Sequence, residues 1–165
     1  MGEQRQAMAQ SAVQRVAGAL AGLGVTAEIV EFAQSTRTAE EAARAIGTTV
    51  ERIVKSLVFV AGDEMLLVLT SGGNRVDVAR LGEALGAPIR RADADAVRQA
   101  TGFAIGGVPP VGHATALPVV MDSDLLQYDL VFAAAGTPHA IFPITPGDLC
   151  RISSARILDI KVHAS

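Results

Sequence analysis

Three observations predict a single mixed α/β (α+β) domain, with helices packed around a central sheet. The chain has 165 residues, which suits one domain, and 50% of them are hydrophobic, which is enough for a sizeable core. Segments typical of strands and helices do not alternate strictly, and several strands are joined by tight turns, which favours a mixed sheet over a regular doubly wound fold. No repeat or linker divides the sequence, so we expect one domain over residues 1–165, with a disordered or frayed end over 1–10.

Capping and turn signals set the elements expected in the first half of the chain. Ser11 can cap a first helix, and Thr38-Ala39-Glu40-Glu41 forms a capping box that opens a second. The β-branched run over 53–60 predicts a buried strand, and Gly62-Asp63 turns it back into another. We expect a helix over 11–23, a strand over 27–32, a helix over 38–47 with a further turn over 50–53, and strands over 53–60 and 65–70.

The second half is expected to hold short helices and the remaining strands. Thr145-Pro146 supplies an N-cap followed by proline at the first helical position. Glycines at 86 and 102 follow two expected helices and are typical of helix ends. We expect helices over 77–85, 93–100 and 145–150, an extended piece over 88–91, and strands over 118–121, 128–135, 139–144 and 156–162.

Composition excludes several classes of partner and compartment. The net charge is −3, and the chain has no Trp and one Tyr, which argues against a broad polyanion-binding face or a stacking platform for single strands. Cys150 is the single cysteine, so no internal disulfide can form, which fits a reducing cytosol. The N-terminus lacks the apolar core of a secretion signal, and no long apolar run exists to span a membrane. We expect a cytoplasmic protein whose partners include neither DNA nor a membrane.

Common metal, cofactor and nucleophile motifs are missing from the sequence. His113, His139 and His163 do not combine with Cys150 in the spacings of zinc ligands, so we expect no metal. No P-loop, dinucleotide fingerprint or nucleophile elbow is present, so we expect no cofactor bound through those motifs and no serine hydrolase triad.

Lys55 lies within the most apolar of the expected strands, between Val54 and Leu57. One interpretation places it on the solvent face, with its aliphatic stem along neighbouring side chains. The other buries the ammonium, which then needs a partner, such as an incoming anion or carbonyl group.

The segment TGFAIGGVPPVGH, residues 101–113, is too apolar for an ordinary surface loop and contains adjacent prolines that a strand would not carry. Glycine lets a backbone approach a ligand closely, and proline fixes the path of the chain. Amides around Gly106 and Gly107, held by Pro110, can therefore donate to an anion or a carbonyl oxygen. The alternative is a tight crossover between strands.

Two other glycine turns carry polar groups. Ser71-Gly72-Gly73-Asn74-Arg75 follows a strand and can offer amides and a guanidinium to a phosphate, and Gly136-Thr137-Pro138-His139 ends in an imidazole at a strand edge. Both can instead be ordinary polar turns.

Three motifs together resemble the prolyl-tRNA synthetase editing-domain superfamily, also called the YbaK-like aminoacyl-tRNA deacylases. They are IVKSLVF with Lys55, GGVPPVGH with a GxxxP element from Gly106 to Pro110, and AAGTPHAIFPITPGDL with Gly136 and His139. Their order and spacing agree over residues 11–162, nearly the whole chain. GxxxP alone is weak, whereas the three motifs in this order are fairly specific, and the chain is similar to a free-standing member.

The resemblance implies a mixed, partly barrel-like sheet surrounded by helices, and a hydrolase that removes a wrong amino acid from tRNA without metal or covalent nucleophile. The substrate implied is the 3′ end of aminoacyl-tRNA, typically tRNA for proline carrying alanine or cysteine. The family's lysine matches Lys55, and its backbone loop matches Gly106 to Pro110. A synthetase or an elongation factor can supply affinity for tRNA.

In this interpretation several residues form the rest of the substrate pocket, and the attacking group is a water or the ribose 2′-hydroxyl. His113 and His139 are candidates to contact the tRNA end or simply to complete turns. Two other functions stay open: a non-catalytic module that binds the amino acid or the aminoacylated end, and a hydrolase of another activated ester. The pocket residues expected are Phe103, Ile105, Val108, Ser71, Gly72, Asn74, Gly136 and His139.

Overall fold

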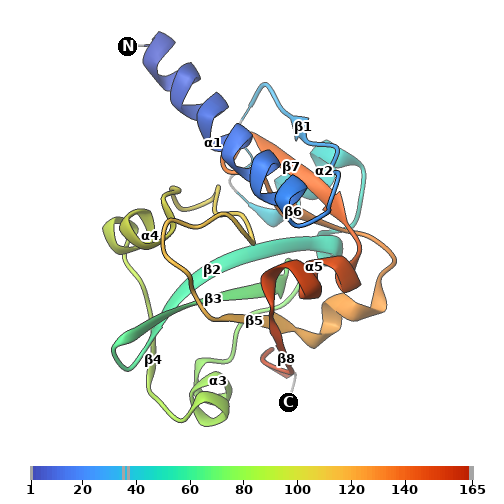
Figure 1. Ribbon diagram of the computed structural model, residues 1–165. Helices are drawn as coiled ribbons and strands as arrows, with labels where there is room; N and C mark the ends of the chain where they lie inside the picture. Colours follow the sequence, from blue (N-terminus) through green and yellow to red (C-terminus); the bar gives the residue numbers. More distant parts are fainter. Residues whose placement is uncertain (1, 35, 37, 164–165) are drawn as a thin grey trace.

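The computed structural model describes residues 2–34, 36 and 38–163, with side chains from residue 11 onward. Within these residues it contains five α-helices, two 3-10 helices and eight strands, and all eight strands join one mixed sheet. The mixed α/β fold expected from the sequence is confirmed (Figure 1). The helices are α1 (Gly2–Gly22), α2 (Ala39–Ile46), η1 (Val50–Arg52), α3 (Val78–Leu85), α4 (Ala94–Thr101), η2 (Ser123–Gln127) and α5 (Pro146–Ser153). The strands are β1 (Val30–Glu31), β2 (Ile53–Ala61), β3 (Glu64–Ser71), β4 (Ile89–Arg91), β5 (Val119–Asp122), β6 (Val131–Ala134), β7 (Ala140–Ile144) and β8 (Arg156–Leu158).

The sheet is built around the long hairpin of β2 and β3. Its strand order is β1-β7-β6-β2-β3-β5-β8, and β4 also pairs with β2. The hairpins β2–β3 and β6–β7 are antiparallel, whereas β2–β6, β3–β5 and β5–β8 are parallel pairs. Figure 1 shows β2 as a long curved strand that reaches from the β6–β7 hairpin to β4.

One edge of β2 is shared by two strands that do not meet. Ile53 and Val54 pair with β6, and Phe59 to Ala61 pair with β4. The pairing toward β4 is extended by one bond, from the Ala92 N–H to the Val58 carbonyl. No described strand pairs with residues 55–57 on this edge, so the sheet has a gap there.

Both faces of the central hairpin are buried, which explains its nearly continuous apolar sequence. On β3, Leu67 and Leu69 join the main core beneath α1 and α5, which contribute Val16 and Leu149. Between them in sequence, Val68 points to the opposite face and packs in a second core with other buried side chains. That second core contains Phe59, Leu66, Val68, Leu81, Val120 and Ile160.

The helix ends follow the capping signals of the sequence. The Thr38 hydroxyl accepts the Glu41 N–H at 3.1 Å, and Asp77 and Asp93 cap α3 and α4 in the same way. Gly102 ends α4 at a φ of 81°, a left-handed conformation that favours glycine. These predicted boundaries are confirmed to within a residue.

Helix α1 is longer than predicted. It begins at Gly2 rather than at Ser11, so the structure continues the helix through 2–10, where we expected a frayed end. The physical reason is that residues 3–10 are Glu, Gln, Arg, Ala and Met, which are strong helix formers with no proline or glycine among them. Within the described helices, none has the length and apolar character needed to cross a bilayer.

The bounds of four other elements were wrong because tertiary partners end earlier or later than propensity suggests. The strand expected over 27–32 shrinks to the two residues that pair with β7 at the end of the sheet. The strand expected from residue 128 begins at Val131, where its pairing with β7 starts, and the prediction missed η2 over Ser123–Gln127. The strand expected over 156–162 ends at Leu158, whereas α5 extends beyond Cys150 to Ser153.

Candidate active site

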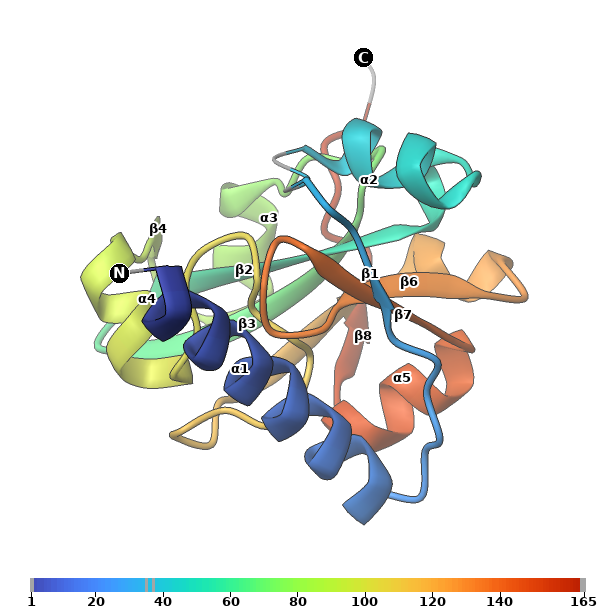
Figure 2. The same cartoon turned by 90° about the horizontal axis from the view of Figure 1, so that it is seen from above.

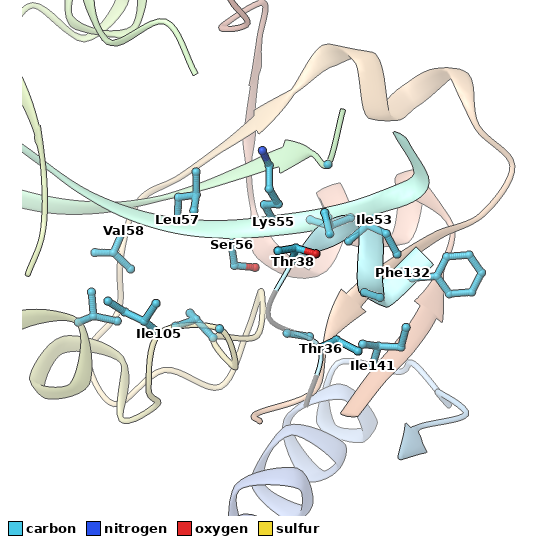
Figure 3. A pocket seen from close by; sticks show the side chains of 18 of the residues that line it. Thr36, Thr38, Ile53, Lys55, Ser56, Leu57, Val58, Ile105, Phe132 and Ile141 are labelled. Carbon is cyan, nitrogen blue, oxygen red and sulfur yellow. The ribbon is translucent and has the colours of Figure 1, made fainter. Parts of the chain in front are cut away.

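A cavity of about 410 Å³ opens at the gap in the edge of β2. Its walls come from the start of α2, from β2, from the end of β4, from the 105–108 segment and from β6 and β7. Figure 3 shows Lys55 and Leu57 on one face of β2, and Ser56 and Val58 on the other, where Ile105 lies. The cavity therefore wraps around the unpaired stretch of the strand, and its volume is typical of a small-molecule site.

Lys55 lies on the cavity wall with its amine anchored. Its Nζ donates to the Asn74 backbone carbonyl at 2.7 Å. Burial lowers the pKa of this amine, the Glu40 carboxylate opposes that shift and the Arg91 guanidinium adds to it. An ammonium has three N–H donors, so two remain for a ligand in the cavity. The partner that the sequence required for a buried amine is thus supplied by the chain itself.

The side chain of Asn74, whose carbonyl accepts from Lys55, is held by a buried carboxylate. Asp122 is 0% exposed, and its Oδ2 accepts the Thr70 hydroxyl at 3.1 Å, the Ser71 N–H at 3.1 Å and the Asn74 side-chain amide at 2.8 Å. Its Oδ1 accepts the Asp124 N–H at 3.0 Å, which caps η2. Asp122 therefore ties the end of β3, the turn after it and η2 into one rigid support behind Lys55.

Asp124 completes this support at the surface. Its Oδ2 accepts both the Asn74 amide at 2.8 Å and the Lys161 ammonium at 2.7 Å. The hydrogen bonds from Lys161 and Asn74 lower the pKa of the Asp124 carboxyl group. Ser71 and Asn74, which we expected to bind substrate, thus serve the support, and the Ser71 hydroxyl donates to the Glu51 carbonyl at 2.6 Å.

Part of the segment over residues 101–113, which contains the GxxxP element, reaches the cavity, and part of it packs behind the cavity wall. Ile105, Gly106 and Val108 line the cavity. Gly107 is buried, and its N–H already donates to the Ala104 carbonyl at 3.0 Å, so this amide is not free for a ligand. An added Cβ at Gly107 would lie 2.7 Å from the Thr137 Cα, which shows how closely the segment approaches the later turn.

The rest of the segment is locked by buried contacts. Phe103 is 2% exposed, and the Arg15 guanidinium of α1 lies 4.5 Å from its ring centroid. Pro109 and Pro110 are buried, and His113 donates from Nε2 to the Pro109 carbonyl at 2.6 Å. Because a carbonyl only accepts, this contact assigns the proton to Nε2. Figure 2 shows α1 crossing the sheet beside this segment.

The turn over residues 136–139 lies behind the cavity wall. Gly136 has a φ of 105°, and an added Cβ would lie 2.9 Å from the Ala12 carbonyl oxygen, so the turn sits tightly against α1. His139 is exposed and does not line the cavity, and its carbonyl accepts the Phe32 N–H at 2.7 Å.

The structure thus brings five of the predicted site residues to one cavity and places the others around it. The lining residues are Lys55, Gly72, Ile105, Gly106 and Val108. Those placed outside the lining are Phe103, Gly107, Pro110, Ser71, Asn74, Gly136 and His139.

Sequence reasoning missed lining residues that have no motif of their own. Thr36, Ser56 and Arg91 bring polar groups to the cavity, and Ala134 and Ile141 bring apolar ones. Ser56 is next to Lys55 and was the one with a usable signal, since it is a polar residue in an apolar strand. Among the described residues, no three His, Cys, Asp or Glu side chains are close enough together to hold a metal ion.

The chain is similar to known proteins of one family. A family model described as the aminoacyl-tRNA editing domain matches residues 33–152. YwhH of Bacillus subtilis, an uncharacterized protein, is 33% identical over 131 residues, which cover 79% of this chain and 83% of that protein. Proline–tRNA ligase of Lactobacillus gasseri is 34% identical over 104 residues, which cover 62% of this chain and 18% of the ligase.

Solved structures agree with the sequence relatives. A structure described as a candidate trans-editing enzyme for prolyl-tRNA synthetase superposes with a TM-score of 0.89 at 49% identity, covering 92% of this chain and 98% of that one. A second chain, used as a scaffold for epitope grafting, gives a TM-score of 0.89 at 46% identity. The mixed sheet with its gapped β2 edge is therefore the editing fold, and the chain belongs to the aminoacyl-tRNA editing domain family.

Proposed function

We propose that this chain is a trans-acting deacylase that hydrolyses the ester bond of mischarged aminoacyl-tRNA. The substrate proposed is tRNA for proline that carries alanine or cysteine. The observation that carries the proposal is the cavity at the β2 gap, which Lys55, Gly106 and an apolar wall line together in a chain of the editing family. The similarity to proline–tRNA ligases and to a candidate trans-editing enzyme supports the choice of tRNA.

Lys55 is proposed to bind the polar groups of the terminal adenosine, its phosphate above all. Its amine is already oriented by Asn74, so little side-chain freedom is lost when the substrate binds. The Arg91 side chain lines the same cavity and adds a second positive charge. Contacts limited to the 3′ end need few phosphate charges, which is compatible with a net charge of −3.

Gly106 is proposed to polarise the ester. Its N–H has no hydrogen-bond partner among the described residues and Gly106 lines the cavity, whereas the Gly107 N–H is engaged within the loop. An oriented amide of this kind can stabilise the developing oxyanion, an effect typically worth about 10²–10³ in rate. Gly107 and Pro110 then act by fixing the loop rather than by touching the substrate.

The attacking group is proposed to be a water or the ribose 2′-hydroxyl of the substrate. No cysteine lines the cavity, because Cys150 lies in α5, and the Lys55 amine already donates to the Asn74 carbonyl. An aminoacyl ester is already activated, so positioning with one oxyanion donor supplies much of the required acceleration.

The apolar wall supports a small amino acid as the error that the site removes. A synthetic site sized for proline rejects smaller amino acids weakly, because each missing methylene is worth only about 1–3 kcal/mol. An enzyme with a second, separate site can hydrolyse the wrong aminoacyl ester that the synthetic site lets form. Val58, Ile105 and Val108 form an apolar side of this cavity that suits a small side chain.

A deacylation panel tests the proposal. tRNA for proline carrying alanine, cysteine, serine or proline, and alanyl-tRNA with its own tRNA, are incubated with enzyme well below the substrate concentration. We expect turnover of the alanyl or cysteinyl ester on tRNA for proline, and little on the prolyl ester. No turnover on any member of the panel refutes the proposed function and leaves a binding module.

Lys55→Ala is expected to abolish turnover while leaving the fold intact, as judged by circular dichroism and thermal unfolding. The matched control is Arg156→Ala, which removes an exposed positive charge from β8 at the far end of the sheet. Full activity of Lys55→Ala would refute the role given to this amine.

A further inference from the structure

The unpaired stretch of β2 leaves main-chain hydrogen-bonding groups facing the cavity. Along a strand, the N–H and C=O of successive residues point alternately to the two neighbouring strands. The Ile53 carbonyl accepts the Gly72 N–H on the β3 side, and the Val58 carbonyl accepts the Ala92 N–H on the opposite side. By this alternation, the N–H and C=O of Ser56 point away from β3 and into the gap.

The pairing of β2 with β6 and β4 leaves Ser56 without a main-chain partner on that side. The ladder with β6 ends at Val54, which pairs with Ala133, and the ladder with β4 starts at Phe59. Ser56 lies between them and lines the cavity. It therefore presents one donor and one acceptor, side by side, as an edge strand does to an incoming strand.

The side chain of the same residue is also unsatisfied. The Ser56 Oγ is buried and has no hydrogen-bond partner, the one such side-chain atom among the described residues. Leaving a buried hydroxyl unpaired costs stability, whereas alanine at this position would avoid the cost. Figure 3 shows the Ser56 side chain on the face of β2 toward Ile105 and Thr36, opposite to Lys55.

We propose that Ser56 recognises the α-amino group and the ester carbonyl of the aminoacyl moiety, which binds as a one-residue addition to the open edge of β2. This proposal rests on the proposed function. An aminoacyl ester carries an ammonium donor and a carbonyl acceptor two bonds apart along its backbone, the same pattern that one residue of an antiparallel partner presents. The Ser56 carbonyl accepts from the ammonium, and the Ser56 N–H donates to the ester carbonyl.

The hydroxyl gives the ammonium a second acceptor. Rotation about the Cα–Cβ bond of Ser56 moves Oγ between staggered positions, so the oxygen can turn toward a bound ammonium. Lys55 and Ser56 then contact different parts of the substrate, because their side chains extend from opposite faces of β2 (Figure 3). Lys55 serves the nucleotide end, and Ser56 serves the amino-acid end, next to the apolar wall of Val58 and Val108.

A stability measurement tests the unpaired hydroxyl without reference to activity. Ser56→Ala is expected to raise the Tm by about 2–4 °C, because it removes a buried group that makes no bond in the free protein. The matched control is Ser153→Ala in α5, whose hydroxyl donates to the Leu149 carbonyl at 2.6 Å, and which is expected to lower the Tm slightly. A fall in the Tm of Ser56→Ala as large as that of the control overturns the claim that this hydroxyl is reserved for a ligand.

A kinetic comparison tests the recognition itself. Alanyl-tRNA is compared with lactyl-tRNA, in which a hydroxyl replaces the α-ammonium at nearly constant size. Wild type is expected to prefer the alanyl ester by at least about tenfold in kcat/KM, since a hydrogen bond to a charged group is lost. Ser56→Ala is expected to lose about 10–100-fold on the alanyl ester and to narrow the preference, whereas Ser56→Thr keeps the hydroxyl and most of the preference.

Two outcomes separate this proposal from the proposed function. If wild type hydrolyses alanyl-tRNA but Ser56→Ala shows the same rate and the same preference over the lactyl ester, the role of the Ser56 hydroxyl is overturned and the deacylase function stands. If wild type hydrolyses neither ester, the proposed function fails, and the recognition of an aminoacyl group fails with it.

Discussion

Replacing Asp122 by asparagine is expected to loosen the support behind Lys55. Asp122 is fully buried at the end of β5, and all of its described partners are donors: the Thr70 hydroxyl, the Ser71 and Asp124 N–H groups and the Asn74 amide. Asparagine keeps the shape of the side chain but replaces one acceptor oxygen by an NH₂ donor. It therefore tests the hydrogen bonds with little change in packing.

The magnitude follows from these contacts. If the remaining oxygen takes the Oδ2 place, the new NH₂ group faces the Asp124 N–H, and a buried donor without an acceptor costs about 1–3 kcal/mol. The three bonds on Oδ2 lose the help of a negative charge, which is worth about 1 kcal/mol each. Asparagine avoids the desolvation of a buried carboxylate, which offsets part of the loss. We expect a net loss of about 2–4 kcal/mol and a fall in Tm of about 5–15 °C.

Urea unfolding gives the stability change from the shift in midpoint at constant slope. The control is Asp148→Asn, whose carboxylate makes an exposed pair with Arg151 at 3.1 Å and is expected to change stability by less than about 1 kcal/mol. Deacylation is measured at a temperature where both variants are folded, and Asp122→Asn should be slower because the Asn74 carbonyl no longer fixes Lys55. Equal stability of variant and wild type would refute the support, and lost stability with unchanged deacylation would refute its link to Lys55.

Two further predictions concern the segment over residues 101–113. Gly107→Ala places a Cβ 2.7 Å from the Thr137 Cα, so the segment must move, and we expect both the Tm, by about 2–10 °C, and deacylation to fall. Gly106→Ala has room, with its nearest atom at 3.8 Å, so its effect on the Tm measures backbone strain alone at a φ of 92°. Burial lowers the pKa of His113, so the folded state resists protonation and loses stability as the pH falls below about 6.5. Between about pH 7.5 and 5.5 the Tm should therefore fall more for wild type than for His113→Gln, and equal falls in Tm would contradict this assignment.

Local signals in the sequence were sufficient for most of the fold. Capping residues such as Thr38 and Asp93 act on backbone groups within three residues, so the helix starts they predict do not depend on the rest of the chain. The β2–β3 hairpin is also local, because Gly62 and Asp63 connect two apolar runs. The strands at the ends of the sheet were misjudged, because their lengths depend on how many residues a distant partner offers.

The site was predictable only in part for the same reason. Lys55 and Gly106 were found because a cation in an apolar strand and a glycine–proline loop are unusual in themselves. Asp122 was missed because an acid after a strand is ordinary until the fold shows it surrounded by donors. Ser56 was missed although a polar residue in an apolar strand is a signal, because only the fold shows that its hydroxyl has no partner. Gly107 was expected to touch the substrate, and only the structure shows that its N–H is already used.

The unusual composition of residues 101–113 follows from the gap that they border. A regular strand placed there would pair with the free N–H and C=O of Ser56 and close the edge of β2. Pro109 and Pro110 have no N–H, so the segment cannot continue a ladder, and Gly107 lets it pack instead against the turn at 136–137. The apolar side chains then cover the core while leaving the strand edge open. Gly107, Pro109 and Pro110 thus shape the segment without lining the cavity, whereas Gly106 lines it.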